Sequence, residues 1–446
     1  MSRRTPARQE LAGVDEMEDT RPMVSNTASA TPSGRVKRLL ALFPLAAVLL
    51  LLAGCGDAFD AHPQNTFNAK GKNAHTIEHL IVPIFGIAAV VFVLVMGGCL
   101  YVALRFRARS EDDYNEFPHQ VHGNFKLEIG WTILPALILL GVAVPTVATI
   151  FKLNEKPAAN ALHVEVIGQQ WWWEYRYDLN NDGKFDEIVT ANDLVMPVGR
   201  EVTLTVTSRD VIHSFWVPEL NGKRDAVPNR LQPWKLQADK PGEYIGQCTE
   251  YCGLSHAEMR IKAIAMSEAD FGTWVTNQQK KAPTYAATDT SEEALGYRVF
   301  TQQLCASCHL IEGVNDSKFA KTVDVGPQKG KPAESGRIAD PKLQTSRHAP
   351  NLTHLMSRTT FAGAKFDLRK DTPECRALGQ AWANNPTDEA KCIDKAALEA
   401  WIRNPPGKKA MAPIGVPGRS LPRGMPNLNL SEDQIDQVVA YLMTLK

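Results

Sequence analysis

The sequence has no excess of charge of either sign. Its 446 residues include 49 Lys+Arg and 49 Asp+Glu, so the formal net charge is zero. Chains that bind nucleic acid usually carry a strongly basic balance, and we therefore expect no nucleic-acid partner. The length is too great for one compact domain and predicts two or three.

Cysteine is scarce, with 8 residues in the whole chain. These residues do not form the dense, regular framework of a small disulfide-stapled protein. They stand at positions 55, 99, 248, 252, 305, 308, 375 and 392. Because they fall into separate groups, we interpret each group by its own neighbours.

Long uncharged apolar runs are also few. Leu80–Leu104 and Ile129–Phe151 are each long enough to cross a bilayer, and they predict a hairpin of two membrane spans. The connection between them carries the basic residues Arg105, Arg107, Arg109 and Lys126. By the positive-inside rule this connection is cytoplasmic, so both ends of the hairpin lie outside.

The first 54 residues predict a leader. Residues 1–34 are rich in Ser, Thr, Pro and charge, and we expect them to be disordered. Arg35–Arg38 followed by Leu39–Leu52 is typical of an export signal. The signal ends in Leu52-Ala-Gly-Cys55, which resembles the bacterial lipobox, so Cys55 is the expected site of lipidation. An uncleaved membrane helix is the alternative, although spanning takes ~20 residues and this run is shorter.

One loop concentrates soft metal ligands. In Cys248-Thr-Glu-Tyr-Cys252-Gly-Leu-Ser-His256-Ala-Glu-Met259, two thiols are followed by an imidazole and a thioether, with no cluster of hard oxygen ligands around them. This donor set suits thiolate-bound copper rather than magnesium or calcium. His213 follows the β-type run Val202–Thr207, and the end of a strand would aim it at the loop.

Two thiolates can bridge two copper ions, with His213 and His256 each capping one ion. Met259 would be a weak axial ligand on one side, and the backbone carbonyl of Glu250 would serve the other. Such a pair shares one electron and changes its geometry little on reduction. A disulfide between Cys248 and Cys252, or a mononuclear zinc or copper site, remains open at this point.

Residues 160–270 carry short β-type runs whose spacing predicts a sandwich or a barrel. The runs are 162–166, 171–177, 202–206, 234–236, 244–246 and 261–265. The segment Asp178–Asp186 resembles the first half of a calcium loop. Its twelfth position is Val189 instead of glutamate, so a hairpin turn at Asp182-Gly183 is the better interpretation.

A second cofactor motif follows a polar linker. Cys305-Ala-Ser-Cys308-His309 has the C-x-x-C-H pattern of covalent c-type haem, in which both thiols bond the haem and the histidine binds its iron. A methionine far downstream is the expected sixth ligand; we assign Met425, with Met411 as the rival. Cys375 and Cys392 lie in an apparent insertion, and outside the cytoplasm we expect them to form a disulfide.

Residues 75–275 resemble subunit II of a haem–copper cytochrome c oxidase. Matching pieces follow in order: Trp131-Thr-Ile-Leu-Pro135, Gly168-Gln-Gln-Trp-Trp-Trp-Glu-Tyr175, His213-Ser-Phe215 and Cys248–Met259. The C-terminal part resembles the caa3-type branch, whose subunit II carries its own cytochrome c. The resemblance implies a multidomain chain: a two-helix transmembrane hairpin, an all-β cupredoxin-like Greek-key barrel and an α-helical class I cytochrome c domain.

The resemblance also implies roles for single residues. Trp171 matches the exposed tryptophan where electrons bound for copper enter. Glu128 matches a glutamate near the mouth of a proton path into subunit I, although a carboxylate at a helix N-terminus is also an ordinary partner of the helix dipole. The side chain of Glu250 matches a magnesium ligand at the boundary with subunit I.

The predicted boundaries are 1–54 for the leader and lipoprotein-type signal peptide, 55–155 for a linker and the hairpin, 156–276 for the copper domain, 277–292 for a linker, and 293–446 for the cytochrome c domain. The implied location is the bacterial inner membrane, with the copper and cytochrome domains on the periplasmic side.

The implied function is that of the subunit through which electrons enter a terminal oxidase. Electrons would pass from reduced cytochrome c or another donor, through the c-type haem and the copper A pair, to haem in subunit I. Oxygen reduction and proton translocation belong to subunit I, and subunit III is a further implied partner. A copper A-containing nitric oxide reductase is the alternative, and it would differ mainly in its partner subunit. A copper-delivery protein and a quinol oxidase fit the motifs less well.

Overall fold

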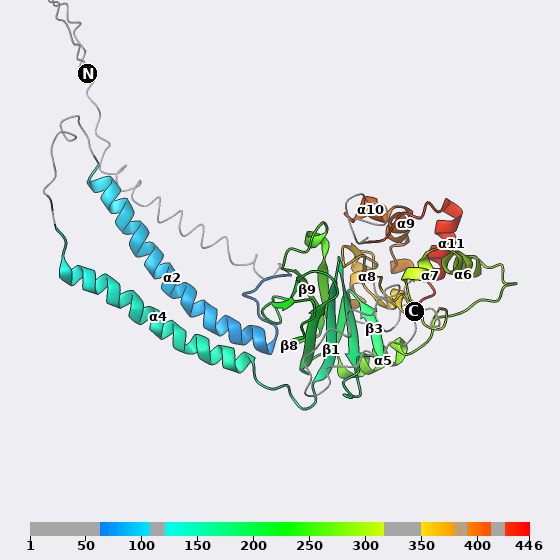
Figure 1. Cartoon of the computed structure of the whole chain (residues 1–446), viewed down its shortest axis with the longest axis horizontal. Coiled ribbons are helices and arrows are strands. Elements are labelled where there is room, and N and C mark those ends of the chain that lie inside the picture. Colours follow the sequence, from blue (N-terminus) through cyan, green and yellow to red (C-terminus); the bar gives the residue numbers. More distant parts are fainter. Residues whose placement is uncertain are drawn as a thin grey trace, which may run out of the picture. The chain divides into compact units, whose positions relative to one another are not determined.

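The computed structural model describes residues 63–107, 120, 122–315, 349–379, 382, 384, 390–411 and 424–446 (Figure 1). The predicted leader and the lipidation site at Cys55 lie outside the described residues. The other residues expected to bind metal or haem are all described.

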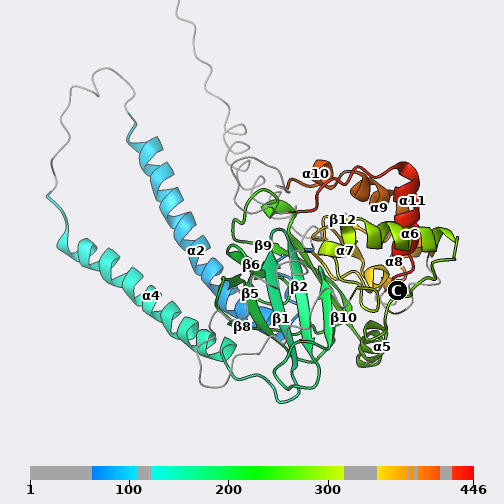
Figure 2. The ribbon, with the colours of Figure 1, turned by 45° about the vertical axis from the view of Figure 1, so that its right-hand side comes forward.

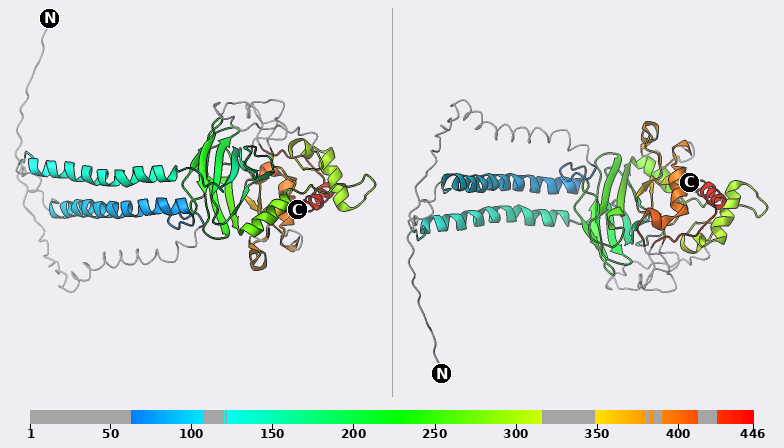
Figure 3. Two further views of the ribbon diagram at one scale, coloured as in Figure 1. Left: turned by 90° about the horizontal axis from the view of Figure 1, so that it is seen from below. Right: turned by 90° about the horizontal axis from the view of Figure 1, so that it is seen from above.

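Two helices cover the predicted membrane spans. They are α2 (Lys72–Arg105) and α4 (Phe125–Leu153), both long and apolar enough to cross a membrane. They run antiparallel (Figure 3). The side chain of Asn124 caps α4 by accepting hydrogen bonds from the amides of Lys126 (3.1 Å) and Leu127 (3.3 Å). Glu128 therefore lies in the first turn of α4 and not at its first residue.

The middle of the chain forms two five-stranded sheets (Figure 2). The first has the order β3-β2-β1-β5-β8, made of Ile188–Ala191, Trp172–Asp178, Leu162–Gln169, Val202–Ser208 and Gln232–Leu236. The second has the order β4-β10-β9-β6-β7, made of Asp193–Pro197, Arg260–Met266, Gly242–Cys248, His213–Trp216 and Arg224–Ala226. The pairs β1–β5 and β4–β10 are parallel. This is the cupredoxin-like sandwich that the resemblance implies.

Alternation along the strands builds the core between the sheets. In β2, Trp173, Tyr175 and Tyr177 recur at every second position, and all three are fully buried. Trp173 packs edge-on against Phe215 of β6, with the ring centroids 5.5 Å apart. Trp173 also lies 5.9 Å from the ring of His213. His213 is therefore supported by closely packed aromatic side chains of the core.

The hairpin predicted around Asp182-Gly183 is present, and a left-handed residue lies elsewhere in the domain at Asn229. Antiparallel pairing of β2 and β3 confirms the hairpin, and the Asp178 carboxylate accepts hydrogen bonds from the amides of Asp182 (3.2 Å) and Gly183 (2.9 Å) within the turn. Asn229 has φ 62°, a left-handed conformation that asparagine tolerates better than most residues.

The C-terminal region is mostly helical. Its helices are α5 (Glu268–Gln278), α6 (Glu292–Gln302), α7 (Cys305–Cys308), α8 (Pro373–Arg376), α9 (Lys395–Arg403), α10 (Pro405–Lys408) and α11 (Glu432–Leu442), and a short hairpin joins β11 (Thr360–Phe361) to β12 (Phe366–Asp367). Helix α5 runs past the predicted boundary at 276, and a disulfide joins Cys375 to Cys392.

Helices α6 and α11 cross closely at a glycine. A Cβ atom on Gly296 would overlap the backbone carbonyl of Gln437, so only glycine fits there. Ser291 caps α6, and a capping box of Ser431 and Gln434 starts α11. The crossing packs Tyr441 of α11 among the aromatic rings of α6.

Candidate metal centre

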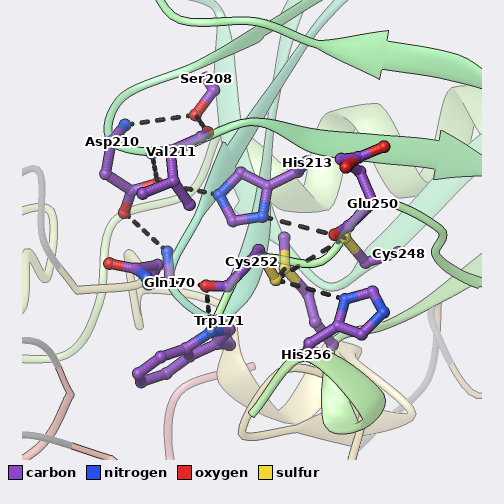
Figure 4. A network of polar contacts seen from close by, with 11 residues as sticks. Gln170, Trp171, Ser208, Asp210, Val211, His213, Cys248, Glu250, Cys252 and His256 are labelled. Carbon is purple, nitrogen blue, oxygen red and sulfur yellow. Dashed lines mark hydrogen bonds and ion pairs between the residues drawn. The ribbon is translucent and has the colours of Figure 1, made fainter. Parts of the chain in front are cut away.

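Strand register brings the candidate copper ligands together. His213 is the first residue of β6 and Cys248 is the last residue of β9. These strands pair antiparallel, with Phe215 opposite Cys248, so the imidazole and the thiol meet at the same end of the sheet. The loop after β9 then returns Cys252, and His256 follows in a single 3₁₀ turn (Figure 4).

The donors divide into two halves. Near the Cys248 sulfur lie Nδ1 of His213 at 3.9 Å and the backbone carbonyl oxygen of Glu250 at 3.3 Å. Near the Cys252 sulfur lie Nδ1 of His256 at 3.5 Å and the Met259 sulfur at 3.9 Å. Each half therefore has one thiol, one imidazole nitrogen and one weak donor, as the dinuclear interpretation requires.

The two sulfur atoms are 3.8 Å apart. A disulfide bond is only ~2.05 Å long, so this geometry does not support the disulfide alternative for Cys248 and Cys252. Both thiols are 3% exposed, and Met259 is fully buried. Hydrogen bonding from the Cys252 thiol lowers the pKa of Cys248 to about 4, and the same contact raises the pKa of Cys252. A bound cation would remove the remaining thiol proton.

His213 is held from behind by a carboxylate. Its Nε2 lies 2.8 Å from Oδ1 of Asp210, which leaves Nδ1 facing the sulfur. Burial by itself would lower the pKa of His213, but the hydrogen bonds and negative charges of Asp210 and Cys248 together outweigh burial and raise the pKa. Oδ2 of Asp210 accepts a hydrogen bond from the Gln170 amide at 2.8 Å. The carboxylate therefore ties His213 to the segment that holds Trp171.

Two residues that position this histidine were not predicted from the sequence. A Cβ atom on Gly168 would lie 2.8 Å from the His213 ring, so the ring occupies space that only glycine leaves free. Asp210 is three residues before His213, and this spacing was the available signal. Gly168 has no ligand atom, and the Asp210 carboxylate contacts Nε2 of His213 instead of the sulfur atoms.

Trp171 is not exposed, and this expectation was wrong. It is 3% exposed, and its Nε1 donates a hydrogen bond to the carbonyl of Cys252 at 2.9 Å. Its own carbonyl accepts a hydrogen bond from Nζ of Lys409 at 2.8 Å. The C-terminal region covers a side chain that the resemblance placed at the surface. Trp171 directly precedes β2, and it belongs to the same buried core as Trp173.

The geometry of the segment Cys305–His309 is compatible with binding of a haem iron. Cys305 and Cys308 are free thiols on the single turn of α7. Nδ1 of His309 lies 2.8 Å from the carbonyl of Pro350, an acceptor, so this nitrogen carries the proton and Nε2 remains available for a metal. Burial lowers the pKa of His309, which favours the neutral imidazole that a metal needs. These residues fit a covalent haem.

The two candidate axial methionines differ in their surroundings. Met411 packs against the core of the copper domain and lies against Gly424. Met425 is partly buried and follows Gly424 directly. Met411 therefore has a packing role on the copper domain, and Met425 as the haem ligand stays a prediction.

The side chains of two further residues, Glu128 and Glu250, lie outside these clusters. Glu128 is exposed in the first turn of α4. The carboxylate of Glu250 points away from the sulfur atoms, while its carbonyl faces Cys248 (Figure 4). The carbonyl and the carboxylate of this residue therefore face different surroundings.

Known proteins match the chain across these elements. A family model described as cytochrome C oxidase subunit II, transmembrane domain, matches residues 63–149, and the model of its periplasmic domain matches residues 162–266. Cytochrome c oxidase subunit 2 of Alkalihalophilus pseudofirmus is 34% identical over 276 residues, covering 60% of this chain and 76% of the relative. The chain belongs to the cytochrome c oxidase subunit II family.

Other subunit II relatives extend further along the chain. Cytochrome c oxidase subunit 2 of Bacillus sp. (strain PS3) is 30% identical over 426 residues, covering 92% of this chain and 97% of the relative. Quinol oxidase subunit 2 of Bacillus subtilis is 32% identical over 296 residues, covering 64% and 87%. The protein is therefore subunit II of a haem–copper oxidase, a two-pass membrane protein through which electrons enter the complex.

A buried charge cluster supports the tryptophan strand of this subunit II chain. The Glu174 carboxylate contacts Arg209 (2.9 Å), Arg176 (2.6 Å) and the Gln169 amide (3.2 Å). Burial by itself would raise the pKa of Glu174, but the guanidinium groups of Arg209 and Arg176 outweigh burial and lower the pKa from 4.5 to about 2. The folded state therefore stabilises the ionised form of the Glu174 carboxylate.

This pKa predicts acid lability. The stabilisation is fully present above pH 4.5 and is lost as the pH falls from 4.5 to about 2, because the unfolded chain takes up the proton first. The shift corresponds to about 3 kcal/mol. Glu174→Gln should lower the free energy of unfolding by a similar amount at pH 7, and the difference from wild type should vanish near pH 2. Unfolding followed by tryptophan fluorescence tests this, and a constant difference across the range would contradict it.

Proposed function

We propose that this subunit II passes electrons from a donor, through a c-type haem and a dinuclear copper A centre, to haem in subunit I, where oxygen is reduced to water with proton translocation. The ligands would be His213, Cys248, the Glu250 carbonyl, Cys252, His256 and Met259 for copper, and Cys305, Cys308, His309 and Met425 for the haem. The observation that supports this proposal most is the arrangement of the donors: one thiol, one imidazole and one weak donor lie on each side of a pair of sulfur atoms 3.8 Å apart.

The number of donors favours two ions. A single tetrahedral zinc takes four ligands, which two thiolates and two imidazoles would supply. The buried Met259 sulfur would then have no role, nor would the Glu250 carbonyl that faces Cys248. Thioether and thiolate ligands together favour copper. When bound, such a pair supplies one-electron transfer with little change in geometry.

The rigid site suits that chemistry. The ligands come from strand ends and a short loop over a core of buried aromatic rings, and His213 is fixed by Asp210. The residues that this chain contributes hold position and exclude water, so little rearrangement accompanies a change in charge.

The membrane arrangement of this proposal follows the charge pattern. Arg105 is the last residue of α2 and Arg107 follows the helix, and the positive-inside rule puts that end in the cytoplasm. The copper and haem regions would then face the periplasm of a bacterial inner membrane, with Cys55 lipidated on the same side. Subunit III, a magnesium ion on the Glu250 carboxylate and a proton-path role for Glu128 belong to this proposal. The relatives reported above are oxidases, and they do not favour a nitric oxide reductase.

Metal analysis with spectroscopy of the purified full chain tests the proposal. We expect two copper ions and one haem per chain, a c-type haem absorption band, and a paramagnetic signal from one electron shared equally by two copper nuclei. Both cytochrome c oxidase and quinol oxidase subunits are similar to this chain, so similarity alone does not decide whether its electron donor is cytochrome c or a quinol. Direct measurement of copper and haem is therefore informative. Zinc in place of copper, or no metal in a haem-loaded sample, would refute the copper assignment.

A further inference from the structure

A cavity of about 150 Å³ lies between the start of α2, the end of α4 and strand β8 of the copper domain. An apolar cavity of about this volume holds benzene, so there is room for a phosphate group. The charged residues that line it are Lys72, Lys152, Glu155, Lys156, Glu201 and Lys235. Four lysines and two glutamates give the lining a formal net charge of +2, which suits an anion.

The walls of this cavity are held in place by contacts around it. Just before α2, the amide of Lys70 donates a hydrogen bond to the carbonyl of Glu219 at 2.8 Å, and the Lys70 ammonium lies 2.6 Å from the Glu219 carboxylate. The carbonyl of Lys70 accepts a hydrogen bond from the Asp239 amide at 2.9 Å. On the side of α4, Nζ of Lys235 donates to the carbonyl of Glu155 at 2.5 Å. Both membrane helices are therefore tied to the copper domain beside the cavity.

The positive charge of the lining is not neutralised within the protein. In the part of the chain that the structure describes, Lys72, Lys152 and Lys156 form no ion pair. The carboxylate of Glu201 accepts a hydrogen bond from the amide of Ala158 at 2.9 Å. The first turn of α2 contains no acidic residue, so the positive end of its helix dipole adds to the charge of the lysines. A bound anion would therefore be attracted from several sides at once.

The cavity lies at the height of lipid headgroups. The apolar run of α4 ends at Phe151, and the lining residue Lys152 comes next. The apolar run of α2 begins at Leu80, four residues after the lining residue Thr76, which is about 6 Å along a helix axis. The polar layer of a bilayer extends about 5–8 Å beyond each side of the hydrocarbon core. The phosphate groups of the adjoining leaflet therefore lie at the level of the lysines.

We propose that this cavity binds the phosphate group of an anionic phospholipid from the adjoining leaflet. Lys72, Lys152 and Lys156 donate to the phosphate oxygens, and the acyl chains lie along the exposed apolar side chains of α2 and α4. One bound lipid thus joins both membrane helices to β8 and fixes the height of the copper domain above the membrane. The site needs only the two membrane spans, so it does not rest on the proposed route of electrons.

Lipid titration of the purified full chain in a neutral detergent, followed by native mass spectrometry, tests the binding without any variant. The probes are phosphatidylglycerol, phosphatidylcholine and inorganic phosphate. We expect one phosphatidylglycerol to bind per chain, and phosphatidylcholine to bind at least about tenfold more weakly, because its choline group cancels the charge that the lysines attract. Millimolar inorganic phosphate should leave the lipid bound. Equal binding of the two lipids would overturn the proposal, and displacement by phosphate would show a site for a free anion instead.

The double variant Lys152→Gln/Lys156→Gln tests the assignment to this cavity. It should weaken the binding of phosphatidylglycerol by about 30-fold, because each lysine near an anionic lipid contributes about fivefold. The matched control is Arg105→Gln/Lys126→Gln, which removes two positive charges at the other end of the hairpin and should leave the affinity unchanged. Both variants should unfold as the wild type does, followed by tryptophan fluorescence. Equal affinities in the two double variants would overturn the proposal. Absence of copper from the wild-type chain would refute the proposed function and leave the lipid result unaffected.

Discussion

Cys252→Ser is expected to remove copper from the chain while leaving the haem in place. The Cys252 sulfur is the centre of one half of the donor set, 3.8 Å from Cys248 and 3.5 Å from Nδ1 of His256. Serine has nearly the same size but offers a hydroxyl, which does not bind soft copper as a thiolate does. The paramagnetic copper signal should disappear. Oxygen consumption of the assembled oxidase should fall by about 100-fold or more, because even residues that only orient a metal ligand cost about 10–100-fold when replaced.

A haem bound at the proposed C-x-x-C-H site should survive this substitution, because the segment around Ala306 belongs to a separate core. The haem motif packs with α6, α9 and α11 in its own cluster, to which Cys252 does not contribute. Cys99→Ser is the matched control, since Cys99 is a free, exposed thiol in α2. It should leave both the copper signal and the haem band unchanged. A Cys252→Ser chain with a normal copper signal would show that Cys252 is not a ligand.

The ligand set could be predicted from the sequence because most of its chemistry lies in one short loop. Five of the six donors, including the Glu250 carbonyl, fall between Cys248 and Met259. The sixth, His213, could be predicted because it follows a β-type run. The supporting residues could not be predicted in this way. Gly168 matters because of space next to His213, 45 residues later, and no local pattern reports such a contact.

The burial of Trp171 shows the same limit more clearly. Alternation predicts one face for Trp171 and Trp173 and the other for Trp172, but Trp171 precedes β2 and Trp172 is buried as well, at 6% exposed. The lysine that covers Trp171 is 238 residues away in the chain. Local periodicity contains no information on a contact between residues so far apart in the chain. The family resemblance had suggested that Trp171 is exposed.

The strands of seven or eight residues could be predicted from the sequence, and so could the five-residue β8. The six β-type runs fall in strands, apart from Trp171 just before β2, whereas β3, β4, β6 and β7 were missed. Strand β7 has only three residues, and every residue of β4 is buried. A strand buried on both faces shows no alternation, and a short one has no room for it. In β4, the covering residues Thr359 and Thr360 bond to Asp193.

Gly296→Ala is expected to destabilise the haem region severely. A methyl group at this position would overlap the Gln437 backbone carbonyl and press on the Cβ atom of Tyr441, and a backbone atom cannot turn aside as a flexible side chain can. The helices α6 and α11 would have to separate, which would open the packing around Tyr441. Overpacking a core costs about 1–3 kcal/mol, and a backbone clash should exceed the upper end of that range.

Gly272→Ala gives the control for helix propensity. Gly272 lies in α5, and no atom lies within 4 Å of where its Cβ would be. Alanine in a helix interior is favoured over glycine by about 0.5–1 kcal/mol, so this variant should be unchanged or slightly more stable. Thermal unfolding monitored at the haem band should show an early transition for Gly296→Ala only, with the copper signal preserved below it. Equal transition temperatures in the two variants would show that the helices do not cross at Gly296.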